Sequence, residues 1–334
     1  MTADRAASGF RGATAANHRL PAIDALERGI ANVRANSELL IVQLVSSVII
    51  AASILVPVML LLSRMGLPFS VLASNDPEAI RAAVEGMSFD PASLVRLFGV
   101  GLVSALAVGT LLFVFYCFMQ GGTLAVLSAG DAQAPPARRL PLEVYRTFSW
   151  RAYFGWCGRF GWRLFWLLNL YLVVISLLLV VLALLLALAA GALGDGNFVA
   201  ACAVACGLSV PFLFLFLVLW IGVQLSSAVL VVEDAGVGRA FRHGLALTGR
   251  RFGGLMLLVI LLIVASLAVS LVFTLLGFGL ELGMSGPSFA RSAVAGGLAV
   301  LQFLASTVLS LVFVGALVAL ARGESRAAAR SVSA

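Results

Sequence analysis

The feature that most constrains this chain is a series of six long stretches with almost no charged side chain. They lie at about 39–62, 94–119, 164–190, 199–232, 254–280 and 292–320. Each has at least the roughly 20 residues that an α-helix needs to cross the hydrocarbon layer of a membrane. Because backbone polar groups must be paired inside hydrocarbon, such runs span as helices. We therefore predict an all-α, polytopic membrane protein with six transmembrane helices.

The composition supports this prediction and excludes other classes. Of the 334 residues, 62% are hydrophobic and only 11% are charged, whereas a soluble domain is about 45–50% apolar and about 25% charged. The net charge is +7 and every basic residue is arginine. These arginines are divided among the connections between apolar runs and form no single basic face, so we expect the lipid bilayer as partner and no nucleic acid.

The placement of the arginines predicts the orientation. Eighteen of the 22 lie in the N-terminal segment, the second and fourth connections and the C-terminal segment, and four lie in the remaining connections. The positive-inside rule then places both termini in the cytoplasm, and six spans agree with that. We expect a disordered cytoplasmic tail at 1–20, a membrane domain at 21–322 and a cytoplasmic tail at 323–334, in the inner membrane of a bacterium.

A helix is predicted at 21–36, before the first span. Ile23, Leu26, Ile30 and Val33 recur on one helical face. The opposite face carries five polar residues, namely Asp24, Glu27, Arg28, Asn32 and Arg34. Because the apolar stripe is narrow, this helix is expected to lie at the membrane surface and not to cross.

A second surface helix, more basic, is predicted before the fifth span. One face carries Arg239, Arg242, His243, Ala246 and Arg250, with Arg251 following, and the opposite face carries Val237, Phe241 and Leu245. This pattern suits a helix that contacts anionic lipid head groups. The predicted contacts are Arg239, Arg242, His243, Arg250 and Arg251, and ordinary topological anchoring by the same arginines is the alternative.

The two surface helices share a short pattern, because residues 25–31 align with residues 240–246 in type and order. An arginine-rich and aromatic stretch occupies the same place before the third span. We therefore predict three units, each an interfacial amphipathic helix followed by a hairpin of two spans. Coincidence in a low-complexity sequence is the alternative.

The segment before the fifth span also carries a resemblance to a known family. Glu233, Gly236, Val237, Ala240, Phe241 and Gly244 form a short motif in front of a spanning helix. In this motif and in its six-helix layout, the chain resembles poorly characterised bacterial membrane families, including the membrane domain found beside some glycerophosphodiester phosphodiesterases. The catalytic phosphodiesterase domain has no counterpart here, so the resemblance implies the layout and not that activity.

No catalytic constellation is found in the sequence. Gly283–Gly286 matches the motif around a rhomboid-protease serine, but the predicted topology separates Ser285 from His243 by the whole hydrocarbon layer. The four cysteines, Cys117, Cys157, Cys202 and Cys206, are expected to be buried and structural. We predict no metal site and no cofactor. No ionisable residue lies well inside a span, which disfavours ion-coupled transport.

Three functions remain. The leading one is a non-enzymatic structural, assembly or lipid-interacting component. The alternative is a transporter or permease for an uncharged or lipid-like substrate, which a polar cavity lined by Gln43, Gln224 and Gln302 would favour. The third is a membrane-embedded enzyme acting on lipids, which would need Glu233, His243 and arginines gathered around a pocket.

Overall fold

The computed structural model describes residues 20–64, 78, 81–82, 91–134, 141–193, 198–283 and 288–333. These residues form α-helices and one short 3-10 helix, with no strand among them, which agrees with the all-α prediction. The elements are α2 (Ala22–Ala35), α3 (Glu38–Arg64), α6 (Pro91–Gln133), η1 (Leu142–Tyr145), α7 (Trp150–Leu193), α8 (Phe198–Val232), α9 (Val237–Arg250), α10 (Phe252–Gly283) and α11 (Ser288–Ser333). The predicted tail at 1–20 falls outside the described residues except for Leu20.

Six of these helices, α3, α6, α7, α8, α10 and α11, are long and apolar enough to cross a membrane. The chain is thus a membrane protein, as its composition predicts. Three helices run well beyond the predicted apolar stretches. Helix α6 continues to Gln133, α7 begins at Trp150 and α11 continues to Ser333. Polar residues in these extensions are paired within the protein, as Asp131 of α6 is with Arg322 of α11 and Arg163 of α7 is with Asp234.

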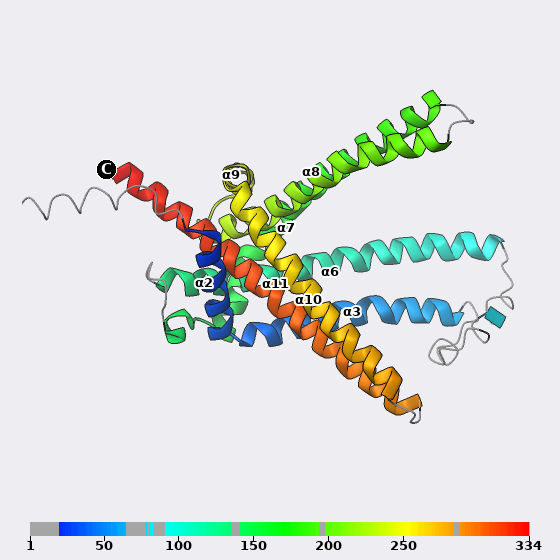
Figure 1. Cartoon of the computed structure of the whole chain (residues 1–334), viewed down its shortest axis with the longest axis horizontal. Helices are drawn as coiled ribbons and strands as arrows, with labels where there is room; N and C mark the ends of the chain where they lie inside the picture. The colour runs from blue at the N-terminus through cyan, green and yellow to red at the C-terminus, as the bar shows by residue number, and fades with distance from the viewer. Residues whose placement is uncertain are drawn as a thin grey trace, which may run out of the picture.

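The six long helices lie as three pairs that diverge from a common base (Figure 1). The pairs are α3 with α6, α7 with α8, and α10 with α11. Among the residues whose burial is described, the buried side chains lie in the basal half of each pair, whereas Leu111, Leu177 and Leu213 in the distal halves are 70%, 68% and 69% exposed. An exposed apolar half is costly in water and costs nothing in lipid, so the divergent halves fit a hydrocarbon environment.

Close helix crossings at glycine hold the base together. Gly29 of α2 lies against the backbone of α11, Gly161 of α7 against Phe118 of α6, and Gly244 of α9 against Ser226 of α8. A Cβ added at any of them would come within 2.7 Å of the neighbouring helix. In each case a segment that precedes or opens one pair packs on the second helix of another pair, so the three pairs interlock in a ring. Gly29 and Gly244, which the sequence alignment matches, thus occupy equivalent positions.

The orientation of α2 differs from the expectation. Its polar residues Arg28 and Asn32 are buried, at 7% and 1% exposure, whereas Ile23 and Ile30 are exposed. Part of the polar face turns inward, because Asp131 and the Leu127 carbonyl of α6 supply partners for Arg28 and Asn32. Glu27 and Arg34 of the same face stay exposed. The apolar stripe is divided as well, because Ile23 and Ile30 lie on the outer surface, where lipid can cover them, whereas Val33 is buried.

Candidate binding cavity and the polar layer beneath it

A cavity of ≈ 190 Å³ lies where the three pairs diverge. It is lined by Gln43, Tyr116, Gln120, Trp220, Gln224, Leu262, Ser266, Ser306, Leu309, Ser310, Leu311, Phe313 and Val314. Side chains from α3, α6, α8, α10 and α11 therefore share one space, although they are far apart in the sequence. None of the lining side chains carries a formal charge.

The cavity lies deep within the candidate spans. Gln120 precedes Asp131 by three helical turns, or about 16 Å along the axis of α6. Gln224 precedes Glu233 on α8 by about 13 Å, and Ser306 precedes Arg322 on α11 by about 24 Å. Since the hydrocarbon layer is about 30 Å thick, the cavity falls near its middle if the charged residues mark one surface.

The three amides in the cavity have no hydrogen-bond partner among the residues that the structure describes. Most other polar side chains in the long helices bond a carbonyl of their own helix one turn earlier, as Ser46 does to Val42 at 2.6 Å and Asn169 to Phe165 at 2.8 Å. Gln43, Gln120 and Gln224 make no such bond within the described part of the chain, and all three are partly exposed to the cavity. An amide in hydrocarbon without a partner is costly, so water or a ligand must supply one.

The predicted glutamine cluster is partly formed. Gln43 and Gln224 line the cavity, but Gln302 lies outside it and donates to Ser270 Oγ at 3.3 Å. Gln120 takes the third place, which the sequence reading did not assign to it. A repeated spacing in the sequence could have identified Gln120. Tyr116 precedes Gln120 by one helical turn, just as Trp220 precedes Gln224, and all four side chains line the cavity.

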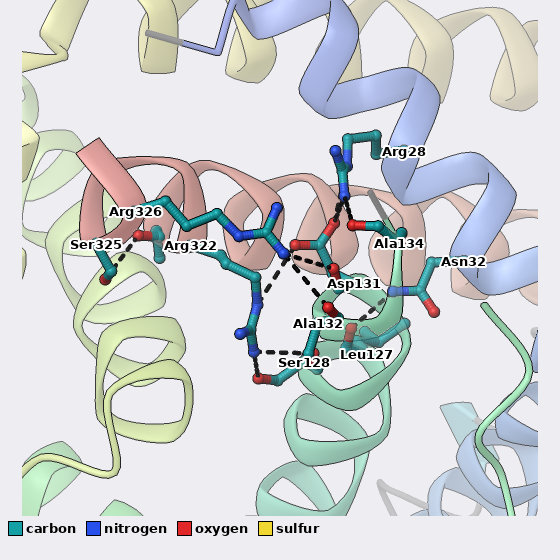
Figure 2. A network of polar contacts seen from close by, with 11 residues as sticks. Arg28, Asn32, Leu127, Ser128, Asp131, Ala132, Ala134, Arg322, Ser325 and Arg326 are labelled. Atoms are coloured by element: carbon teal, nitrogen blue, oxygen red, sulfur yellow. Dashed lines mark hydrogen bonds and ion pairs between the residues drawn. The ribbon is translucent and has the colours of Figure 1, made fainter. Parts of the chain in front are cut away.

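A charged layer lies beneath the cavity, centred on Asp131 near the end of α6 (Figure 2). Arg28 of α2 donates from Nε to its Oδ1 at 2.8 Å. Arg322 of α11 forms an ion pair with Oδ2, its Nε lying 3.4 Å away, and donates from an Nη to Ser128 Oγ at 2.6 Å. The Asp131 side chain is only 3% exposed, and a buried carboxylate of this kind requires such partners.

The same layer caps the C-terminal end of α6, whose last carbonyls have no partner within the helix. Arg322 donates to Ser128 O at 2.9 Å, Arg28 to Ala134 O at 3.3 Å and Arg326 to Asp131 O at 3.4 Å. Positive charge at a helix C-terminus is favourable because the helix dipole is negative there. The excess of arginine over aspartate in this cluster is thereby accounted for.

Two buried asparagines join α2 to the rest of the layer. Asn32 Nδ2 donates to Leu127 O at 2.7 Å, and Asn36 Nδ2 donates to Tyr145 O at 2.8 Å. Asn36 Oδ1 accepts the backbone N–H groups of Thr147 and Phe148. Neither asparagine was predicted to be structural, although their i, i+4 spacing at the junction of two helices was a usable signal.

The five predicted lipid contacts fall into two groups. Arg239, Arg242 and Arg250 are exposed on α9. His243 and Arg251 are engaged within the protein, because His243 Nδ1 lies 3.1 Å from Glu233 Oε2 and Arg251 Nε donates to Glu324 at 2.5 Å. The structure therefore leaves three of the five side chains directed away from the core.

The connection before α9 is held by Asp234, which adopts a left-handed backbone conformation with φ 49. Its carboxylate accepts from Arg159 at 2.5 Å and from Arg163 at 2.7 Å, both on α7. The hydrogen bond from Arg159 is the main cause that holds the pKa of Asp234 below its usual value. This side chain is exposed, so the contact orders the connection without a large contribution to stability.

The arrangement of Glu233, His243 and Ser325 bears on the enzyme hypothesis. Ser325 Oγ donates directly to Glu233 Oε1 at 2.7 Å, and the imidazole bonds the other oxygen of the same carboxylate. A Ser–His–Asp triad needs the imidazole between the hydroxyl and the carboxylate, and that order is not found here. Ser285 lies outside the described residues.

We expected all four cysteines to be buried, and the structure shows that this is wrong for two of them. Cys117 and Cys157 are buried, whereas Cys202 and Cys206 are exposed on the distal half of α8. Within the described residues, no group of three or more His, Cys, Asp or Glu side chains is placed to hold a metal ion.

Comparisons with protein-family models, with curated proteins and with solved structures found no match to this chain. The resemblance to the membrane domain found beside glycerophosphodiester phosphodiesterases therefore stays a prediction, and the function must be argued from the geometry.

Proposed function

We propose that this chain is a non-enzymatic membrane protein that binds an uncharged or lipid-like molecule in the cavity between its helix pairs. The observation that supports this most directly is the set of three amides, from α3, α6 and α8, that line one uncharged cavity and make no hydrogen bond to the described residues. Ligand sites are mostly apolar, with a few convergent polar groups, and this cavity has that character.

Within this proposal, a permease is the more specific form of a lipid-interacting role. The helix pairs diverge (Figure 1), and their distal halves carry many exposed apolar side chains, among them Leu111, Leu177 and Leu213. A molecule that leaves the cavity can thus pass between the pairs into lipid. A tightly packed apolar bundle would have favoured a purely structural or assembly role, and the distal halves are not packed in that way.

The proposed topology has three hairpins, each with an interfacial helical segment, and both termini in the cytoplasm of a bacterium. It is supported by the gathering of the arginine-bearing segments α2, α9 and the C-terminal end of α11 at the base (Figure 1). Exposed Arg239, Arg242 and Arg250 are suited to anionic head groups at that surface. Glutamine at these positions is expected to reduce the anionic lipid that remains bound after purification.

Native mass spectrometry of the protein purified in mild detergent tests the cavity. We expect the wild type to carry a bound uncharged molecule, and the double variant Gln120→Leu/Gln224→Leu to lose it. Gln302→Leu is the matched control, because it makes the same change outside the cavity. Equal retention by the wild type and the double variant would contradict the proposal, as would the absence of any bound molecule.

A further inference from the structure

Resting on the proposed function, we infer that the cavity ligand is a neutral glycerolipid. Its hydroxyl-bearing head group lies among Gln43, Gln120 and Gln224, and its acyl chains lie between the diverging helix pairs. A diacylglycerol has this chemistry. The size, polarity, depth and surroundings of the cavity each lead to this class.

The size admits a head group and not a whole lipid. At the roughly 30 Å³ that a water molecule occupies in the liquid, a cavity of ≈ 190 Å³ holds about six waters. That space suits a glycerol group with its ester carbonyls. The remaining part of any lipid must lie outside the cavity, along the exposed apolar walls.

The polarity requires a ligand that both donates and accepts hydrogen bonds. The lining offers three carboxamides, each with a donor and an acceptor, together with Tyr116, Trp220 and the hydroxyls of Ser266 and Ser310. A hydroxyl and ester carbonyls can satisfy such a set. A hydrocarbon chain alone would leave the amides unpaired, which is costly at this depth.

The charges disfavour a phospholipid head group. The cavity lining holds no arginine, histidine or carboxylate. Arg28 and Arg322 lie in the layer below and are engaged with Asp131. Moving a phosphate into this cavity would remove it from water without a counter-charge, and the cost of burying an unpaired charge is high.

The walls beyond the cavity are suited to acyl chains. On α10, Ile263 and Leu267 are exposed next to the lining residues Leu262 and Ser266, and on α11 Val300 and Leu301 are exposed above Ser306. On α3, Val48 and Ile49 follow Gln43 and are exposed as well. These side chains lie about 100–140° around their helices from the lining residues, so they form apolar surface that flanks the cavity, where the acyl chains of a bound lipid can lie.

Quenching of Trp220 provides the test, because Trp220 lines the cavity and stacks on Phe313 with ring centroids 5.7 Å apart. The other four tryptophans all lie on α7, so their replacement by phenylalanine leaves one reporter. The protein is placed in vesicles of phosphatidylcholine that contain dibrominated diacylglycerol, with bromines near the glycerol end. Dibrominated phosphatidylcholine and dibrominated phosphatidylglycerol serve as comparison probes.

We expect saturable quenching by diacylglycerol at mole fractions where the two phospholipid probes quench only weakly. Gln120→Leu should raise the half-quenching concentration about fivefold, which is the loss of one hydrogen bond. Gln302→Leu should leave it unchanged. If the single-tryptophan variant does not fold, the difference in quenching between the wild type and Trp220→Phe gives the same quantity.

Equal quenching by all three probes, or stronger quenching by phosphatidylglycerol, would overturn the inference. If mass spectrometry finds a cavity-dependent molecule while diacylglycerol fails to quench, the proposed function stands and the ligand class is wrong. If neither experiment detects a ligand, both proposals fail.

Discussion

Two polar regions lie on the same helix, α6, three turns apart, and they differ in how their side chains are satisfied. Around Asp131, charged groups are buried, and Arg28, Asn32 and Arg322 all bond partners within the protein. Around Gln120, the side chains are neutral, and the three amides bond nothing in the described chain. The first pattern is that of a structural clamp, and the second is that of a site whose partner comes from outside.

The difference shows that a polar side chain inside a membrane protein can serve either folding or binding. A buried charge with its counter-charges joins helices, and its removal should affect folding. A neutral group that faces a cavity without a partner should affect binding and leave folding nearly unchanged. The predictions below separate these two expectations, beginning with the largest effect.

Asp131→Asn should be the most destabilising substitution. It removes the carboxylate charge that Arg28 and Arg322 share, and removal of one partner of a buried ion pair costs about 3–5 kcal/mol. Thermal or denaturant unfolding in detergent measures the effect. Asp234→Asn, at an exposed carboxylate in the connection before α9, serves as the same change outside the layer. A stability loss equal to that of the control would refute the clamp.

Gly244→Ala should come next. Its Cβ would lie 1.9 Å from Ser226 Oγ and 2.6 Å from Ser226 Cα, so α9 and α8 would have to separate. Overpacking of this kind costs about 1–3 kcal/mol. Gly238→Ala on the same helix is the matched control, since nothing lies within 4 Å of the added carbon. Equal unfolding temperatures for the two variants would show that α9 and α8 do not cross closely at Gly244.

Gln120→Leu should change stability by less than about 1 kcal/mol, because the amide makes no hydrogen bond within the described chain that the substitution would break. Measured in detergent without added lipid, its unfolding temperature should equal or exceed that of the wild type. A destabilisation as large as that of Asp131→Asn would mean that Gln120 is a structural residue, and the contrast between the two regions would be lost.

Asp234→Asn should have the smallest effect, and one that depends on pH. The pKa of Asp234 is lower in the folded protein than in the unfolded chain. Its ion pairs therefore stabilise the fold fully at a pH above the pKa of the unfolded chain, which is about 3.9 for Asp. This stabilisation is lost as the pH falls through the pKa of the folded protein. Asparagine also tolerates the left-handed backbone, so only the charge changes.

The unfolding temperatures of the wild type and Asp234→Asn should therefore differ slightly at pH 7 and converge as the pH falls below about 4. A difference that persists unchanged in acid would show that Arg159 and Arg163 do not act through this carboxylate.

The sequence predicted the all-α class and the six long helices because hydrocarbon length and the absence of charge are local properties of each run. It did not predict that Arg28 pairs with Asp131, since the partners are 103 residues apart and meet only where helices cross. For the same reason α2 was expected to lie at the membrane surface, whereas partners on α6 bury Arg28 and Asn32 of its polar face.

The cavity was predictable only in part. The polar character of Gln43 and Gln224 indicated a cavity, but the choice between Gln120 and Gln302 depended on which helix faces converge. The repeated aromatic-to-glutamine spacing on α6 and α8 was the local sign that these two helices present equivalent faces. The glycine crossings at the base explain why α6 and α8 present equivalent faces, because each of the two helices is contacted by a glycine of another helix pair or of the segment before it.

The most direct test of the contrast is a cryo-electron microscopy map of the protein in nanodiscs made from its native membrane. We predict density in the cavity within hydrogen-bonding distance of Gln43, Gln120 and Gln224, continuing between the helix pairs, while the contacts around Asp131 remain as described. A closed cavity, with the three amides bonded to one another or to their own helices, would contradict the account.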